Sequence, residues 1–357
     1  MDNAWRILSK HFVHCRDLVT DFSHFTIPRK LDLFFPNLKI YKEETILDYP
    51  PQGSARSLLD ALRDGAPKLT KASVRDLHPC FPYTRLSFLE ITNFSDLQNM
   101  KALFRLLPIC PRLESLSLLG MDNYDVDPFT REIKVPNLRR LSIFEHTCSS
   151  HPEEDILDTV LLSLKLPGLK AFELHCEEWP NSLDVSVNYF TSSLETLKVH
   201  ICASEEVDTS HHPLLELLHR LPNLAHLEVH LGWDKDLPGQ NSEYSLTILS
   251  ALLSELVVDA GKTRTSSYAD HILLPRLQFL SLSLADLPIL DTQIVDLVLE
   301  VVSSRASRSE SSPLHRLKTF KLGYHDRQVL PNPIALERVR EFEQELGVEV
   351  VLGRMSP

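Results

Sequence analysis

The chain has 357 residues, with 49 acidic against 37 basic side chains and a net charge of −12. Such an acidic surface repels phosphate backbones, so we expect no nucleic-acid partner. Glycine is scarce (10) while hydrophobic residues form 43% of the chain, which disfavours compact α/β enzymes with glycine-rich ligand loops and excludes a largely disordered protein.

Residues 1–35 contain no good copy of the pattern that dominates the rest of the sequence. Trp5, Leu8 and Phe12 fit a short helix, and Leu18 and Phe22 fit a capping strand. We find no apolar leader and no Cys-x-x-Cys pair among six cysteines, so we expect reduced thiols and a cytoplasmic or nuclear protein. No stretch approaches the roughly 18 apolar residues of a membrane-spanning helix, so we expect no membrane partner.

A repeated motif, Pro-x-Leu-x-x-Leu-x-Leu with apolar substitutes, runs along the remainder of the chain. The distance from one copy to the next is mostly close to the period of leucine-rich repeats. The copy at Leu38 and the copy Leu69/Ala72/Val74 are weak. The first apolar residues of the other copies are, in chain order, Leu86, Leu113, Leu138, Leu169, Leu194, Leu224, Leu253, Leu277 and Leu317.

Each copy predicts a short strand, because the Leu-x-Leu part alternates apolar and polar residues. The polar residues between the leucines indicate that one face of the sheet is exposed, whereas the strands of a doubly wound sheet would be apolar throughout. Segments between the copies have helical periodicity and predict amphipathic helices. Their apolar stripes include Leu97/Met100/Phe104/Leu107, Ile156/Val160/Leu164, Leu214/Leu217/Leu221 and Ile294/Leu297/Val298/Val301.

The last repeats are less regular. The long step from Leu277 to Leu317 includes a serine-rich stretch around Arg305 and Arg308, which we interpret as a polar loop. After it, a helix with Gly347 at its C-terminal end and a final strand over 348–352 are expected to close the domain. The apolar side of that helix would consist of Leu336, Val339, Phe342 and Leu346.

These elements predict an α/β fold: a leucine-rich-repeat solenoid, or horseshoe, with a parallel concave sheet and outer helices. Residues 1–35 would form an N-terminal helix and capping segment. Residues 36–357 would form the repeat domain, with about ten units and a C-terminal cap.

The side chains between the leucines are expected to form a binding surface for a protein on the concave face. Leu119 and Phe144 are neighbours there and form an apolar spot, which suits either a protein contact or an ordinary surface position. The residues that we predict to bind the partner are Glu90, Ser117, Leu119, Ser142, Phe144, Glu173, His175, Lys198, His200, Glu228, His230 and Asp259.

Three of these residues, His175, His200 and His230, follow equivalent leucine or valine positions and should stack as a ladder across neighbouring strands. A divalent metal site, a pH-sensitive contact and a plain polar strip are the alternatives. A straight ladder diverges along the sheet and does not give tetrahedral geometry for zinc, so we favour the polar strip and predict no metal site.

Catalytic motifs are absent from the sequence. No two glycines are two or five positions apart, which excludes the Gly-x-Gly dinucleotide turn and the phosphate-binding P-loop. The sequence also lacks a Gly-x-Ser-x-Gly elbow and a His-Glu-x-x-His motif. We therefore expect no catalytic residues, no cofactor and no enzymatic activity.

The repeat units resemble the leucine-rich regions of fungal F-box proteins. Typical phrases are Val135-Pro-Asn-Leu-Arg-Arg-Leu-Ser-Ile143 and Leu221-Pro-Asn-Leu-Ala-His-Leu-Glu-Val229, and the resemblance covers about residues 36–357. In that family the repeats capture a substrate for ubiquitination, while an N-terminal F-box binds the adaptor Skp1. The Leu-Pro-x-Glu-like turn that opens an F-box is not found here, so we expect the F-box to be missing and binding to a Skp1-type adaptor to be doubtful.

The resemblance implies a protein–protein interaction module. We expect it to be the substrate-recognition part of an F-box-type (SCF) ubiquitin ligase receptor, or of a relative without the F-box. The alternative is a free-standing leucine-rich-repeat scaffold or sensor unrelated to ubiquitination. Binding to Skp1 would separate the two.

Overall fold

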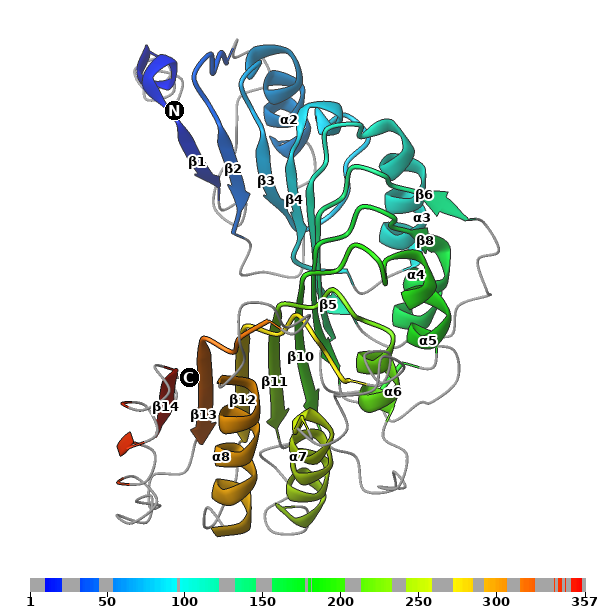
Figure 1. Ribbon diagram of the computed structural model, residues 1–357. Coiled ribbons are helices and arrows are strands. Elements are labelled where there is room, and N and C mark those ends of the chain that lie inside the picture. The colour runs from blue at the N-terminus through cyan, green and yellow to red at the C-terminus, as the bar shows by residue number, and fades with distance from the viewer. Residues whose placement is uncertain are drawn as a thin grey trace. The chain divides into compact units, whose positions relative to one another are not determined.

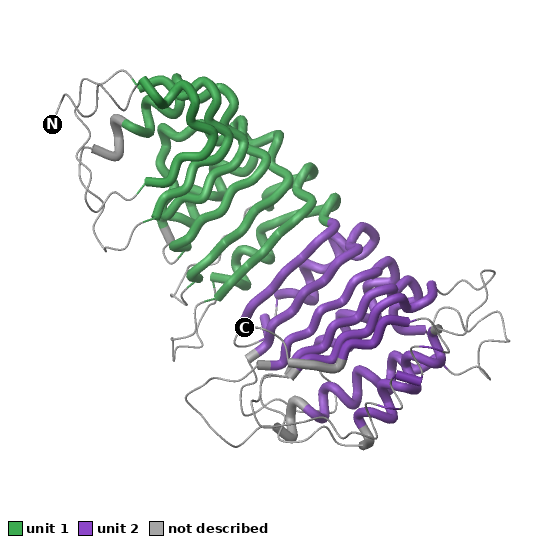
Figure 2. Tube along the Cα trace, turned by 90° about the vertical axis from the view of Figure 1, so that its left-hand side faces the viewer, with its two compact units in different colours: residues 1–169 green, residues 170–357 purple. Residues whose placement is uncertain are grey.

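The computed structural model describes residues 10–20, 33–44, 54–94, 97–121, 132–145, 156–176, 179–180, 182–202, 213–232, 242–258, 272–284, 292–306, 315–324, 337, 340–341, 344 and 348–354. The chain divides into two compact units, residues 1–169 and 170–357 (Figure 2). None of the described helices combines the length and the apolar character that crossing a membrane requires.

Twelve short parallel strands form one sheet in which each strand lies beside the next one along the chain. This order is the one expected of a leucine-rich-repeat-like solenoid and confirms the predicted α/β class. In unit 1 the strands are β1 (Asp17–Thr20), β2 (Ile40–Glu43), β3 (Lys71–Val74), β4 (Phe88–Ile91), β5 (Ser115–Met121) and β7 (Arg140–Glu145). In unit 2 they are β9 (Ala171–Cys176), β10 (Thr196–Cys202), β11 (His226–Gly232), β12 (Phe279–Leu284), β13 (Thr319–Tyr324) and β14 (Glu349–Arg354).

Helices occupy the connections between many of these strands. In unit 1, α2, α3 and α4 lie on the same side of the strands, and in unit 2 the long helices α7 and α8 lie side by side (Figure 1). The α-helices are α2 (Ser54–Gly65), α3 (Leu97–Leu106), α4 (Ile156–Ser163), α5 (Leu183–Ser186), α6 (Pro213–His219), α7 (Ser242–Leu256) and α8 (Thr292–Ala306). The 3₁₀ turns are η1 (Phe12–His14), η2 (Tyr83–Arg85), η3 (Leu107–Ile109) and η4 (Val187–Tyr189), and β6 (Ile133–Lys134) pairs with β8 (Leu164–Lys165) in a small separate sheet.

A tight turn explains why proline precedes many of the strands. The N–H of Leu138 donates to the carbonyl oxygen of Val135 at 3.3 Å, and the N–H of Leu224 donates to that of Leu221 at 3.1 Å. Pro136 is therefore the second residue of a β-turn, where its fixed φ angle is favourable. We call this feature the strand-initiating turn. It places the first leucine of each motif in the core before the strand begins.

The carbonyl group that follows this turn aligns one repeat with the next. The oxygen of Glu114 accepts hydrogen bonds from the N–H groups of Arg139 and Arg140, at 2.8 and 2.9 Å. Other carbonyl oxygens at the same position of the motif each accept two such bonds, among them those of Arg16, Glu195 and Gln278. The same register therefore passes from strand to strand within each unit, and it puts the leucines of these strands on one side of the sheet.

An asparagine directly before the first leucine of some motifs adds a side-chain hydrogen bond to the preceding repeat. Asn137 donates from Nδ2 to the carbonyl of Pro111 at 2.8 Å, and Asn223 donates to that of Ser192 at 2.9 Å. Each acceptor lies two positions before the first apolar residue of the preceding repeat. Asn37 makes the equivalent bond to Val13 at 2.7 Å.

The bond to Val13 identifies Cys15-x-x-Leu18-x-Thr20 as a degenerate first copy of the motif. Its strand is β1, which pairs in parallel with β2, so the strand predicted around Leu18 is confirmed. Phe12 belongs to the short turn η1. Trp5, Leu8 and Phe22 lie outside the described residues.

The core consists of the motif leucines and of the apolar faces of the helices. Leu89, Leu116, Leu169, Leu197 and Leu227 are completely buried. Strand β9 shows the underlying alternation, since its even positions are buried and its odd positions are half-buried. This period-two pattern confirms the strand assignment of the motif.

Two local predictions were wrong. The first concerns the copy at Leu253/Leu256/Val258, which forms no strand: Leu253 and Leu256 lie in α7, and β12 pairs directly with β11. A Leu-x-x-Leu spacing also matches one face of a helix, and Ile248, Leu249 and Leu252 extend that face.

The second concerns Arg305, which does not lie in a polar loop, because this residue is part of α8 and is 2% exposed. Arg308 lies outside the described residues. At the C-terminus the predicted strand is β14, and the described residues 337, 340, 341 and 344 are helical and exposed. The apolar side chains expected on that helix, and Gly347, are among the residues that are not described.

Candidate functional site

The side chains between the buried leucines form the surface that we call the open face. It carries three rows of residues, one before, one between and one after the last two apolar positions of each motif. The strand register aligns these rows. In unit 2, for example, Glu173 pairs with Lys198 and Lys198 with Glu228, and one row further on His175, His200 and His230 are aligned. Each unit is described separately below.

In unit 1 the open face is moderately polar. Glu90, Ser117 and Ser142 are aligned on β4, β5 and β7, as predicted. The hydroxyl of Ser73 on β3 donates to Oε1 of Glu90 at 2.6 Å. Ser117 is nearly covered, with 8% of its surface exposed. In this part of the row, Glu90 is therefore the charged side chain, and its carboxylate is positioned by Ser73.

The predicted apolar spot also lies in unit 1. Leu119 and Phe144 are paired in the register of β5 and β7, and both are half-buried. The strand β5 is irregular immediately after this pair, between Leu119 and Met121, and Gly120 has a φ of 71°. A left-handed backbone of this kind suits glycine. The irregularity comes after the pair, so Leu119 and Phe144 remain neighbours on the open face.

In unit 2 the three histidines form the predicted ladder. The Nδ1 atoms of His175 and His200 are 3.1 Å apart, and the ring centroids of His200 and His230 are 5.7 Å apart. Nε2 of His175 lies 3.5 Å from a carboxylate oxygen of Glu173. A neutral His175 with its proton on Nε2 can then accept a hydrogen bond on Nδ1 from His200. Polar contacts therefore link Glu173, His175 and His200, and the ring of His230 lies beside that of His200.

A second group of side chains on the open face surrounds Glu228. The carboxylate receives hydrogen bonds from Nε2 of His226 at 2.7 Å and from Nζ of Lys198 at 2.9 Å. The ring of His226 stacks on Phe279, with centroids 3.9 Å apart and planes inclined by 22°. Nζ of Lys321 lies 5.3 Å from the centre of the Phe279 ring, which is a cation–π distance.

We call Lys198, His226, Glu228, Phe279 and Lys321 the Glu228 cluster. The hydrogen bond from His226 is the main reason that the pKa of Glu228 falls to about 2; Lys198 acts in the same direction, while burial opposes both. The carboxylate is thus charged throughout the physiological range. It holds two flexible donors in place and presents them beside an aromatic ring.

The predicted partner-binding residues do not include three members of this cluster, His226, Phe279 and Lys321. His226 and Phe279 lie in the row that precedes the second apolar residue of the motif, two positions before Glu228 and Ser281. The alternation of the strand extends to that row, so counting one step back along each motif would have found them. Asp259, by contrast, was predicted from the copy at Leu253 and lies outside the described residues.

Metal binding depends on several convergent ligands. Among the described residues, no three histidine, cysteine or acidic side chains converge as a metal site would require. Within the described part of the chain, Cys15, Cys80, Cys110 and Cys176 form no disulfide bond. Cys110 and Cys176 are buried, and burial raises the pKa of Cys110 to about 11, so this thiol remains protonated.

No protein-family model matches the sequence, and no curated protein matches it.

Proposed function

We propose that the chain is a protein–protein interaction module that binds its partner on the open face. The observation that carries this proposal is the Glu228 cluster. Lysine and histidine side chains normally lose rotamer freedom when a partner binds, and this loss weakens affinity. Here the central carboxylate already orders Lys198 and His226 beside Phe279. Aromatic side chains fixed among hydrogen-bonding groups are typical of binding hot spots.

The scaffold under the cluster also favours recognition. Its members come from β10, β11, β12 and β13, which are joined by consecutive parallel pairings. Side chains on such strands are held more firmly than side chains on loops. An ordinary solvated surface would also contain charges, but it would not require a stacked imidazole and a shared carboxylate on neighbouring strands.

For the biological role we propose substrate recognition in an F-box-type ubiquitin ligase receptor or in a relative without the F-box. The support is the resemblance of the repeats to fungal F-box proteins together with the Glu228 cluster. A free-standing scaffold in the cytoplasm or nucleus is the second candidate. We propose no catalytic activity, since the cluster contains no serine, threonine or cysteine that could serve as a nucleophile.

The first experiment identifies proteins captured by the full chain from native cells and compares two variants. Lys198→Glu reverses a charge in the Glu228 cluster. Lys170→Glu is the matched control, because Lys170 also forms a lysine–glutamate pair, with Glu195 at 2.7 Å, but lies before the strand rather than on it. We expect Lys198→Glu to remove the specific partner and Lys170→Glu to retain it. If both variants capture the same proteins as the wild type, the open face is not the binding surface.

The second experiment mixes the purified chain with purified Skp1. A stable complex supports the receptor role. If no complex forms while the partner is still captured through the Glu228 cluster, the free-standing scaffold is favoured. The two experiments therefore separate the place of binding from its biological purpose.

A further inference from the structure

A cavity of about 610 Å³ lies in the helical layer of unit 1, away from the open face. It is bordered by the end of α2, by the connection between β3 and β4, and by α3 and η3. We call it the α2–α3 hollow. Its walls include Leu77, Phe81, Tyr83, Leu106 and Ile109.

The hollow exists because one repeat is too short to contain a helix. The step from Leu69 to Leu86 is shorter than the step between any other two neighbouring copies of the motif. The connection between β3 and β4, residues 75–87, is described throughout and contains the short turn η2 but no α-helix. The connections before β3 and after β4 contain α2 and α3. One position in the helical layer is therefore left without a helix of this chain.

The floor of the hollow is apolar. The rings of Phe81 and Tyr83 lie 4.9 Å apart, and Phe81 also contacts Tyr41, with ring centroids 5.6 Å apart. The hydroxyl of Tyr83 accepts a 2.9 Å hydrogen bond from the N–H of His78, so its polar end is satisfied. At the mouth, Ile109 is 56% exposed and extends the apolar surface outward.

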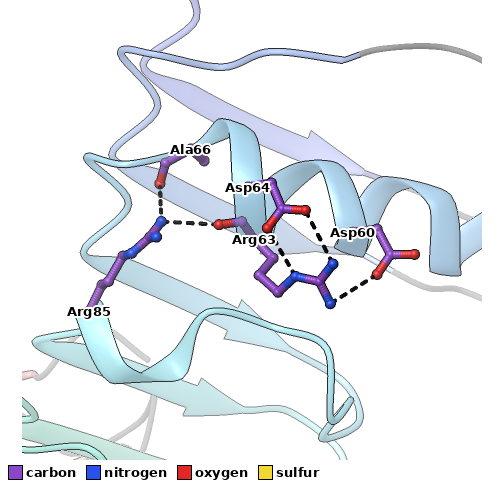
Figure 3. Close-up of polar contacts among 5 residues, drawn as sticks. All are labelled: Asp60, Arg63, Asp64, Ala66 and Arg85. Atoms are coloured by element: carbon purple, nitrogen blue, oxygen red, sulfur yellow. Dashed lines mark hydrogen bonds and ion pairs between the residues drawn. The ribbon is translucent and has the colours of Figure 1, made fainter.

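The charged groups of the hollow are all basic. Arg63, Arg85 and Arg105 contribute to its lining, which contains no acidic residue. Nη1 of Arg85 donates to the carbonyl oxygens of Arg63 and Ala66 at 3.2 and 3.4 Å and so caps the end of α2 (Figure 3).

Arg63 differs from Arg105 in its charge balance. Figure 3 shows Arg63 paired with Asp60 and Asp64, at 3.4 and 3.0 Å, so its charge is offset. Arg105 has no ion pair within the described part of the chain. It is exposed on α3, one helical turn before Ile109. An uncompensated cation thus lies beside an exposed apolar side chain.

We propose that the α2–α3 hollow docks an acidic amphipathic segment of a partner protein. Apolar side chains of that segment would cover Ile109 and enter the cavity towards Phe81 and Tyr83, while its carboxylates would pair with Arg105 and with the remaining donors of Arg85. Charge complementarity selects an acidic segment over a basic one. The exposed Ile109 favours a segment over a small molecule, because apolar surface continues outside the cavity. This surface is distinct from the open face, and the proposal does not depend on the one made above.

The test selects peptides from a displayed random library on the immobilised full chain. Selected peptides are then measured against wild type, Arg105→Glu, Ile109→Asp and the control Arg112→Glu, an exposed arginine outside the hollow. We expect peptides that combine acidic with leucine or aromatic residues and that bind about tenfold more weakly to Arg105→Glu and Ile109→Asp, but not to Arg112→Glu. All three substituted positions are exposed, and thermal unfolding verifies that each variant is folded.

Three outcomes would overturn the proposal. The library could yield no binding peptide, or peptides rich in basic residues, or peptides whose affinity is the same for all variants. A parallel titration with decanoate tests the small-molecule alternative. If decanoate binds to wild type and not to Arg105→Glu while no peptide is selected, the hollow is a site for small carboxylates and not a docking site for a protein.

Discussion

The Nε atom of Arg305 donates a 2.8 Å hydrogen bond to the carbonyl oxygen of Leu256, the last residue of α7. Its Nη1 and Nη2 atoms donate to the carbonyls of Leu274 and Leu273, at 3.0 and 2.6 Å. One buried guanidinium thus joins two helices and the turn that leads to β12. Leu274 itself has a φ of 51°, a conformation that L-amino acids rarely adopt without support from their surroundings.

Replacing Arg305 by leucine should therefore destabilise unit 2. The variant would leave three carbonyl groups buried without these donors, and we expect the free energy of unfolding to fall by about 3 kcal/mol or more. Urea unfolding measures the change, and hydrogen exchange should show faster opening of α7 and α8. Arg276→Leu is the control, since this arginine is exposed and its loss should have little effect. Equal stability of the two variants would contradict the structural role of Arg305.

The Glu228 cluster predicts a specific dependence on pH. The lowered pKa of Glu228 means that its ionised form is stabilised by folding. This contribution is complete above the pKa of an unfolded glutamate, roughly 4.3, and is lost as the pH falls from there towards 2. Because the carboxylate is partly exposed, we expect its contribution to be on the order of 1 kcal/mol.

The variant Glu228→Gln tests this dependence. Its free energy of unfolding should be below that of wild type at pH 7, and the difference should shrink between pH 4.5 and pH 2. Urea titrations at several pH values measure it. A difference that stays constant over this range would show that glutamine disturbs packing and that the charge itself contributes nothing.

The histidine ladder should not bind zinc. Within the described residues no third ligand converges on His175 and His200, and zinc sites require a near-tetrahedral set. Titration with zinc should show negligible binding for wild type and for His200→Ala alike. Stoichiometric binding that disappears in His200→Ala would refute this prediction.

The asparagine bonds between repeats should each make a modest contribution to stability. Asn137→Ala and Asn223→Ala remove one side-chain hydrogen bond to a backbone carbonyl, and we expect a loss of about 1 kcal/mol for each. Arg112→Ala, at the equivalent position of a repeat without asparagine, is the control. Thermal and urea unfolding measure these losses. Losses no larger than that of the control would mean that solvent replaces the asparagine bonds.

The sequence predicted most of the sheet because the motif fixes both the turn and the alternation of each strand. The strand prediction failed at Leu253, because the spacing of Leu253 and Leu256 fits the motif but also fits the apolar face of α7. Arg305 was misplaced because serines and charged residues surround it in the sequence. Its burial depends on hydrogen bonds to backbone carbonyl groups, and no sequence pattern indicates such bonds. The short step between Leu69 and Leu86 was visible, but the hollow also depends on where α2 and α3 end.

The histidine ladder and the Leu119–Phe144 pair were predictable, since both follow from register alone. The Glu228 cluster was only partly predictable. Glu228 and Lys198 were expected on the same face, but the stacking of His226 on Phe279 depends on side-chain conformations that periodicity does not determine.

The strand-initiating turn has a consequence for how such a chain can change. Strands such as β7, β11 and β12 are aligned by a short turn of their own repeat and by one carbonyl group of the repeat before it. Because these turns and carbonyl groups carry the alignment, the steps between motifs can differ as widely as the short one from Leu69 to Leu86 and the long one from Leu224 to Leu277. Insertions and deletions there can create or remove helices, hollows and loops on one side of the protein, while the pattern of side chains on the other side is inherited intact.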